Sequence, residues 1–393
     1  MKHALDGIRV VAFEHSVGGP YCTRLLSDLG AEVVKIERPM SGDFSRAWDS
    51  FANGFSSTFV WLNRNKQSLT LNVKKREGKE ILGKLIRRSD IFIQNFAPGV
   101  VERLGFGYRK IQRSNPRLIY CNISGYGSRG PYGRMKAYDM LVQGESGLIN
   151  FTGQTDKPAR VGISICDISS GVMATIAILA ALVQRQETGQ GQEINISMFE
   201  AILDWLSYPI YCYLNSGVQL RRTGMRHSLI VPYGVYSSKD GKMINFAVEH
   251  NEEWKRFCKT ILSRPELAHD PEYETNQMRL KNRENLESLI EEEFKKHSIA
   301  EMISLFRKAE IPYGLVNNFA EVTAHPQLNY LKMVRKLTIS NRTLKVLANP
   351  LHMSKSTHKM LPPPHLGQQT NSIIRSLGYS KSKIEKMRQS GII

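Results

Sequence analysis

The first 127 residues alternate between short apolar runs typical of strands and segments whose apolar residues recur at helical spacing. The strand patterns cover residues 8–13, 31–37, 68–73, 91–96 and 117–127, and the helical patterns cover 19–30, 75–90 and 100–116. A chain that alternates in this way folds into a parallel sheet with helices packed on its faces. We therefore predict the α/β class, with a large Rossmann-like parallel-sheet domain.

The pattern changes near residue 210. A hairpin pattern covers residues 235–248, with a turn at Lys239-Asp240-Gly241, and helical patterns follow at 251–262, 282–297 and 300–310. We predict a large domain over 1–209, a smaller α+β domain over 210–330, and a segment over 331–393 that returns to the large domain.

The formal net charge of +18 indicates an anionic partner such as nucleic acid, acidic lipid or a polyphosphate cofactor. A general solubility charge accounts for the same excess equally well. The basic residues are spread along the chain in short runs such as 74–76 and 221–222. Clustered base-contacting motifs are missing from the sequence, so a basic nucleic-acid-binding protein ranks low and we expect no nucleic-acid partner.

The five cysteines are far apart and form no CxxC pair. This spacing favours reduced thiols over disulfides or a zinc site, so we predict no metal and a cytoplasmic location. The apolar run 172–183 has 12 residues, whereas a transmembrane helix needs about 20, so we expect no membrane association.

A single acid, Asp167, lies in the stretch SICDISSG, directly before that apolar run. An aspartate before a helix is usually an N-cap that accepts backbone N–H groups. The same position suits a nucleophile, because small neighbours leave the carboxylate approachable. Local sequence alone leaves both interpretations open.

Several blocks of sequence together resemble one family, the class III (CaiB/BaiF-type) CoA-transferases, which include the formyl-CoA:oxalate and carnitine CoA-transferases. The blocks cover residues 6–13, 19–46, 63–73, 95–108, 124–140, 159–171, 185–201 and 362–368 in the family's order. Segments 226–241 and 311–327 are most similar to the succinyl-CoA:dicarboxylate (glutarate-type) branch.

The resemblance implies an enzyme that moves CoA from an acyl-CoA donor, succinyl-CoA-like, to a small carboxylic or dicarboxylic acid. Asp167 falls on the family's catalytic aspartate, which forms an aspartyl anhydride and then an aspartyl-CoA thioester. Coenzyme A enters as a substrate, and no metal takes part. The resemblance further implies a homodimer of interlocked chains. A glycine-rich loop of the family's small domain has its counterpart at 247–254, which contains no glycine.

The resemblance also assigns the residues around the thioester and the CoA. These are His15, Ser16, Val17, Arg38, Leu71, Asn72, Val73, Lys74, Asn95, Phe96, Ala97, Arg103, Lys136, Ala137, Tyr138 and Asp139. Arginine and lysine suit the phosphates of CoA. For the distal carboxylate of the acceptor, Arg226 and His227 are the candidates, although a buried structural histidine is an equally good interpretation of His227.

An acyl-CoA racemase of the same fold is the main alternative. In racemases the glycine segment leads into Gly-His-Asp, whose histidine moves a proton, whereas this chain has Ala137-Tyr138-Asp139. A phenol with a pKa near 10 transfers protons poorly at neutral pH, so Tyr138 favours the transferase.

Overall fold

The computed structural model describes residues 2–339 and 341–393, which form two compact units. The first unit contains Met1–Ser146, Val161–Tyr208 and Asn329–Ile393, and the second contains Gly147–Arg160 and Pro209–Leu328. Each unit has its own buried core. The candidate site described below lies in the first unit.

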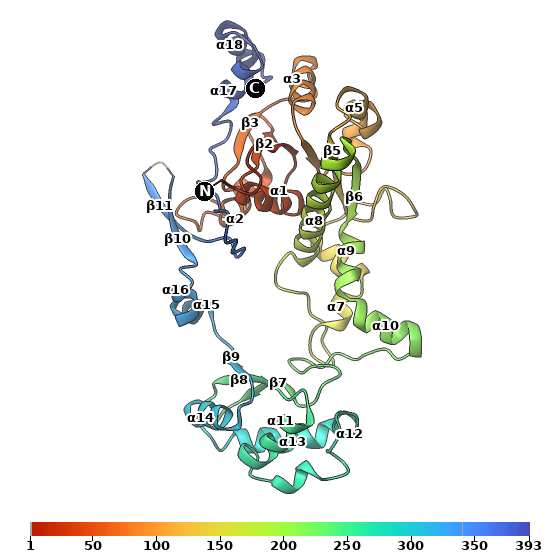
Figure 1. The fold of residues 1–393 in the computed structure, drawn as a ribbon, viewed down its shortest axis with the longest axis vertical. Helices are drawn as coiled ribbons and strands as arrows, with labels where there is room; N and C mark the ends of the chain where they lie inside the picture. The colour runs from red at the N-terminus through yellow and green to blue at the C-terminus, as the bar shows by residue number, and fades with distance from the viewer. Residues whose placement is uncertain (1, 340) are drawn as a thin grey trace. The chain divides into compact units, whose positions relative to one another are not determined.

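Six strands among the described residues form the parallel sheet of the first unit, in the order β3-β2-β1-β4-β5-β6 (Figure 1). Their bounds are β1 Arg9–Phe13, β2 Glu32–Glu37, β3 Gln67–Thr70, β4 Ile91–Gln94, β5 Ile119–Ser124 and β6 Glu193–Ser197. This is the strand order of a doubly wound dinucleotide-binding fold, which reverses direction between β1 and β4. The predicted α/β class and parallel sheet are confirmed.

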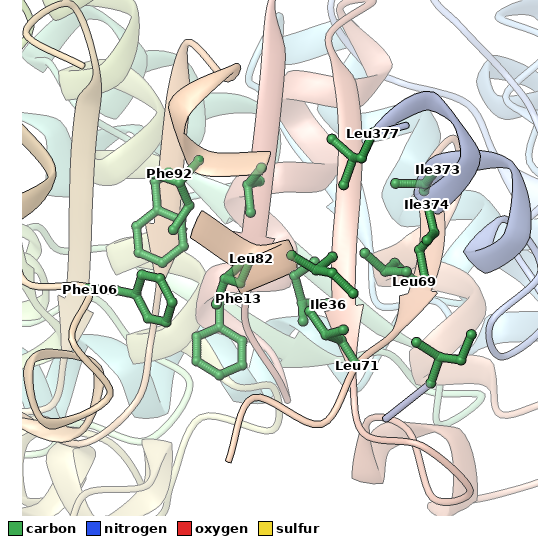
Figure 2. Packing of buried hydrophobic residues seen from close by; sticks show 14 of the residues in the cluster. Phe13, Ile36, Leu69, Leu71, Leu82, Phe92, Phe106, Ile373, Ile374 and Leu377 are labelled. Atoms are coloured by element: carbon green, nitrogen blue, oxygen red, sulfur yellow. The ribbon is translucent and has the colours of Figure 1, made fainter. Parts of the chain in front are cut away.

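Both faces of the sheet are buried, which explains why its strands are almost continuously apolar. Val10 and Ala12 of β1 pack with α1 (Gly18–Asp28) and α8 (Ile165–Thr188) on one face. The alternate residues Val11 and Phe13 pack with α3 (Arg76–Arg87) and α5 (Tyr108–Ser114) on the other face. Figure 2 shows Phe13 beside Leu82 of α3.

Short helices complete the first unit. They are η1 Phe44–Ala47, α2 Ser57–Asn63, α4 Val100–Arg103, α6 Asp139–Glu145, α9 Met198–Trp205, α17 Thr370–Ser376 and α18 Lys381–Gln389. A two-stranded hairpin of β10 (Val334–Ile339) and β11 (Arg342–Leu347) also belongs to this unit.

The C-terminal segment covers the outer edge of the sheet. Backbone and side-chain hydrogen bonds join the edge strand β3 to Gln369 and Thr370, for example from the Thr70 N–H to Thr370 Oγ1 at 3.0 Å. Residues of α17 and α18 then pack into the same buried cluster as β3. An uncovered edge is open to pairing with other chains, and this segment closes it.

The second unit is built on an antiparallel sheet of β7 (Tyr233–Ser237), β8 (Met243–Ala247) and β9 (Tyr313–Leu315). Its helices are α7 Leu148–Phe151, α11 Asn251–Thr260, η2 Pro265–Ala268, α12 Asn276–Lys281, α13 Arg283–Phe294, α14 Ile299–Ala309 and α15 Phe319–Ala324. Two further helices, α10 Ser207–Ser216 and α16 Pro326–Tyr330, cross the boundary between the units in sequence.

Helix α8 differs from the sequence expectation in two ways. It begins at Ile165, so Asp167 lies inside its first turn, and of the two interpretations left open for Asp167 the N-cap of this helix does not hold. The helix has 24 residues and is long and apolar enough to span a membrane, so the argument from a 12-residue run fails. Half of its most apolar window is buried in the protein, where it packs on α1, β5 and α9.

Candidate active site

The first turn of α8 is capped by a residue from elsewhere in the sequence. Asp139 Oδ1 accepts hydrogen bonds from the backbone N–H groups of Cys166 at 2.7 Å and Asp167 at 3.2 Å. The residue at the N-cap position, Ser164, makes no capping bond with its side chain. The side chain of Asp167 is therefore released from capping its own helix.

Asp139 is itself fixed from two sides. Its Oδ2 accepts from Gln143 Nε2 at 2.6 Å within α6. Two residues earlier, Ala137 packs against Gly125 so closely that a Cβ on Gly125 would lie 2.1 Å from the Ala137 Cβ. Only glycine fits there, which explains the first glycine of the GYG loop in physical terms.

The Asp167 carboxylate faces the beginning of a second helix. Its Oδ1 accepts from the N–H of Gly18 at 3.2 Å, and Gly18 is the first residue of α1. Val17 at the N-cap position has no group that could accept this bond. Asp167 thus takes the place of a cap for α1, where the helix dipole favours negative charge.

Glycines allow α1 and α8 to approach closely enough for this contact. A Cβ on Gly171 would lie 2.8 Å from the Gly18 carbonyl oxygen, and a Cβ on Gly18 would lie 3.1 Å from Asp167 Oδ1. A larger residue at either position would push the helix start away from the carboxylate.

The environment of Asp167 makes its carboxyl group unusually basic. Burial and the nearby Asp139 carboxylate raise the pKa of Asp167 from 3.8 to about 7, while the Gly18 N–H acts in the opposite direction. The group can therefore hold or release a proton at neutral pH. A pKa so matched to neutral pH is common among catalytic groups.

The loop that presents Gly18 is held by two further side chains. Asn95 forms a two-way clamp on His15, accepting from its N–H at 3.0 Å and donating to its carbonyl oxygen at 2.8 Å. Asp43 Oδ1 accepts from the N–H of Ser16 at 3.2 Å. Ser16 has φ of 62°, which a serine rarely adopts, so these contacts stabilise a conformation that the loop would not favour alone.

Asp43 in turn belongs to a buried cluster of charged side chains. Lys35 Nζ lies 2.8 Å from Asp43 Oδ2 and 3.5 Å from Glu14 Oε1, and Lys66 Nζ lies 2.8 Å from the same Glu14 oxygen. All four side chains are buried. Burial alone would raise the pKa of Asp43, but the Lys35 ammonium and the N–H groups of Ser45 and Ser16 together hold it far below its usual range. Burial lowers the pKa of Lys66 to about 8.

A cavity of about 640 Å³ opens at the carboxyl ends of β1, β2 and β3, and Phe96 and Val100, which follow β4, complete its wall. It lies where the strand order reverses, which is where doubly wound folds bind their ligands. Its walls combine apolar side chains with three cations, Arg38, Lys74 and Arg103. Three acids also line it, and each of them is paired with a lysine or arginine outside the wall: Glu14, Glu37 and Asp43. His15 lines the cavity, and Gly18, three residues later, contacts Asp167, so one loop connects the cavity with the carboxylate.

The structure brings together half of the residues expected to bind CoA. Those that line the cavity are His15, Arg38, Leu71, Asn72, Val73, Lys74, Phe96 and Arg103. Ser16 and Val17 lie beside the cavity, in the loop that leads to Gly18. Asn95 holds that loop through His15, and Ala97 follows Phe96 in the chain. Ala137 and Asp139 support the start of α8, while Lys136 and Tyr138 are exposed next to them.

Sequence reasoning missed part of the cavity wall. The residues it did not name are Phe13, Glu14, Ile36, Glu37, Pro39, Ser41, Gly42, Asp43, Phe44, Val100 and Leu104. Most of them follow β1 or β2 directly, and the rule that ligands bind at the carboxyl ends of parallel strands would have indicated them.

Arg226 and His227 lie in the second unit. Arg226 Nη2 lies 2.7 Å from Glu291 Oε1, and its guanidinium stacks on the Tyr236 ring at 3.6 Å. The His227 ring stacks on Tyr233, and its Nδ1 accepts from the N–H groups of Leu229 and Ile230. Both side chains have structural contacts here, and their role toward an acceptor acid stays a prediction.

Comparison with known proteins identifies similar chains over nearly the full length. Residues 5–370 match CoA-transferase family III. The chain is 35% identical to the succinyl-CoA:glutarate CoA-transferase of Mus musculus, with 99% of this chain and 90% of that protein covered. It is 33% identical to the acetyl-CoA:oxalate CoA-transferase of Acetobacter aceti, with 97% and 98% covered. A crystal structure of a CaiB/BaiF family protein from Brucella suis superposes with a TM-score of 0.84 at 32% identity, covering 96% of this chain and 100% of that one.

Proposed function

The chain belongs to CoA-transferase family III, a family of enzymes that transfer CoA between carboxylic acids, and we propose that it moves CoA from a succinyl-CoA-like donor to a small dicarboxylic acid. The observation that carries the proposal is the carboxylate of Asp167 at the start of α1, joined by one loop to a cavity with three cations. The names of both relatives described above include a dicarboxylate acceptor, glutarate or oxalate.

CoA suits the cavity in size, and three cations of its wall can meet the phosphates. A volume of about 640 Å³ is typical of cofactor sites. Arg38, Lys74 and Arg103 supply donors for phosphate groups, and the apolar walls suit an adenine ring and a pantetheine arm. The thioester end would then point along the 15–18 loop toward Asp167.

Transfer proceeds in four steps that need no external energy source. Asp167 attacks the thioester carbon and the C–S bond breaks, which gives a mixed anhydride and CoA thiolate. The thiolate attacks the Asp167 Cγ, releases the donor acid and leaves an aspartyl-CoA thioester. The acceptor carboxylate then displaces the thiolate from Cγ, and the thiolate attacks the acceptor carbonyl and restores free Asp167.

Two features of the site assist these steps. The Gly18 N–H already faces Asp167 Oδ1, so it can donate to the oxyanion that forms at Cγ. A pKa of about 7 keeps a usable fraction of the carboxylate ionised at neutral pH while making it more basic, and so more nucleophilic, than an ordinary aspartate.

The racemase alternative depends on a proton-transferring group at position 138. Tyr138 is 72% exposed, so burial gives its phenol no special reactivity. Incubation with a chiral 2-methylacyl-CoA in deuterated water tests this alternative, since a racemase would exchange the proton on the carbon next to the thioester.

A panel of acceptors tests the proposed function directly. Succinyl-CoA and acetyl-CoA are each offered to oxalate, malonate, succinate, glutarate and acetate, and product CoA esters are measured. We expect transfer from succinyl-CoA to at least one dicarboxylate. We also expect borohydride or hydroxylamine, when added during turnover, to modify Asp167 covalently. Absence of any transfer, or full activity in Asp167→Ala, would overturn the proposal.

We also propose that the active form is a homodimer. Side chains of α10 are exposed although apolar or aromatic, with Tyr211 at 60%, Tyr213 at 57% and Leu214 at 70%. Such a group on one helix is typical of a protein interface. Light scattering coupled to size exclusion should give twice the chain mass of 44.6 kDa, and a monomer at all concentrations would contradict this.

A further inference from the structure

Residues 390–393 contact the loop that follows β3, which forms one wall of the cavity. The Asn72 N–H donates to the Ile392 carbonyl oxygen at 2.7 Å, and Asn72 Nδ2 donates to the Gly391 carbonyl oxygen at 3.4 Å. Lys75 Nζ donates to the Ser390 carbonyl oxygen. Three consecutive carbonyl groups of the C-terminal segment therefore bind a four-residue stretch of the loop.

The loop is also confined on its other side. A Cβ on Gly78, in the first turn of α3, would lie 2.1 Å from the Asn72 carbonyl oxygen, so the helix backbone presses directly against Asn72. Within the loop, Asn72 Oδ1 accepts from the N–H of Lys74 at 3.1 Å. The contacts on Asn72 therefore set the path of the chain at Val73 and Lys74, both of which line the cavity.

The C-terminal segment is anchored firmly enough to hold this loop. Ile392 is 4% exposed and Ile393 is 9% exposed, and both belong to the buried cluster that includes Leu71. Other members of this cluster, Ile373, Ile374 and Leu377 of the α17 region, are shown beside Leu69 and Leu71 in Figure 2. Burial of these two side chains removes apolar surface from water, which keeps the segment in place against the loop.

We propose that residues 390–393 position the 71–75 loop for binding the nucleotide end of CoA, so that they set CoA affinity without taking part in transfer. The inference rests on the proposed function, since it takes the cavity as the CoA site. Asp167 is held by different contacts, from Gly18 and Asp139, which the C-terminal segment does not make. Loss of this segment should therefore raise KM for acyl-CoA and leave kcat at saturation almost unchanged.

The experiment compares deletion of residues 390–393 with matched substitutions. CoA binding is measured by calorimetry with CoA itself, and KM and kcat are measured for succinyl-CoA. We expect the deletion to raise Kd and KM about tenfold or more, with kcat within about twofold. Ile290→Ala, in the separate buried cluster of the second unit, controls for general destabilisation and should leave Kd close to that of the wild type.

A second variant keeps the test decisive if the deleted protein does not fold. Lys75→Met removes the bond to Ser390, and Lys75→Arg should restore it. Arg76→Met removes a charge at the next position, where the side chain pairs with Glu80 one turn later in the same helix. We expect Kd for CoA to rise a few-fold in Lys75→Met, to return with arginine, and to stay constant in Arg76→Met.

Hydrogen exchange separates this inference from the proposed function. Peptides covering residues 70–75 should exchange faster in Lys75→Met and in the deletion than in the wild type, whatever the ligand of the cavity is. If wild-type protein binds no CoA, the proposed function fails while the exchange result still tests the contact. Two results overturn the inference. One is exchange of residues 70–75 that is the same in the variants as in the wild type. The other, if the wild type binds CoA, is an equal CoA affinity of the wild type and the variants.

Discussion

Asp43 and Asp167 hold the same short loop, but their surroundings shift their pKa values in opposite directions. Asp43 accepts the N–H of Ser16, and Asp167 accepts the N–H of Gly18 two residues later. Asp43 has the ammonium of Lys35 at 2.8 Å, which lowers its pKa strongly. Asp167 has another carboxylate, Asp139, nearby, and its pKa is raised to about 7.

The difference separates a structural group from a reactive one. A carboxylate paired with a buried lysine is stable as an ion, so it is a weak nucleophile and suits a structural role. A carboxylate with a second carboxylate nearby and a single N–H is poorly stabilised as an ion, so it retains the basicity that a nucleophile needs. The four predictions below test this contrast, beginning with the largest effect.

Asp167→Asn should abolish CoA transfer, because an amide cannot form the anhydride. We expect kcat to fall by about 10⁴-fold or more, with CoA affinity retained because Asp167 does not line the cavity. Steady-state transfer and calorimetry with CoA measure the two quantities. Activity within tenfold of the wild type would show that Asp167 is not the nucleophile.

Lys35→Met should destabilise the protein by about 3–5 kcal/mol, because it leaves Asp43 and Glu14 buried without that cation. Urea unfolding at pH 7 gives the change in the free energy of unfolding. Lys2→Met removes an exposed lysine and serves as the matched control. A loss below about 1 kcal/mol would mean that the buried cluster does not fix the loop.

Asp167→Asn should stabilise the fold above neutral pH. The folded-state pKa of Asp167 is raised, so its contribution to stability is greatest below pH 4 and is lost as pH rises through about 7. The asparagine variant escapes that loss, so it should be more stable by roughly 4 kcal/mol at pH 8 and no more stable than wild type near pH 4. Thermal and urea unfolding across this pH range measure the difference. A difference that does not depend on pH would contradict the assigned pKa.

Asp139→Asn should produce the smallest effect, a shift in the pH profile. Removing this carboxylate eliminates one of the two causes that raise the pKa of Asp167. The rise of kcat/KM with pH should therefore move to lower pH by roughly half a unit to one unit. Asp43→Asn provides the contrast, because burial and Asp139, and not Asp43, raise the pKa of Asp167. The pH profile of this variant should keep its position. An unmoved profile in Asp139→Asn would leave burial as the sole cause.

The sheet could be predicted from the sequence because its strands are buried on both faces and read as apolar runs. Residues 8–13, 31–37 and 91–96 match β1, β2 and β4 within a few residues. The start of α8 could not be predicted in this way, because the residue that caps it, Asp139, lies 27 residues before Cys166 in sequence.

The candidate site was predicted in part for a similar reason. Resemblance to the family supplied Asp167 and the cations of the cavity, which stand in contiguous motifs. The pairing of Lys35 with Asp43 has no local signal, since a lysine inside an otherwise apolar strand is usually exposed at an edge. Contacts between segments far apart in sequence, such as those of residues 390–393 with Asn72, follow only from the folded chain.

The covering of β3 has a consequence for synthesis of the protein. The hydrogen bond from Thr70 reaches Thr370, 300 residues later in the chain. At about 5–20 residues per second, a ribosome needs roughly 15–60 s to make the intervening stretch. Throughout that interval β3 can pair with β2 on one side while its outer edge stays open, so chaperones that shield such edges should bind it before residue 370 emerges and release it afterwards.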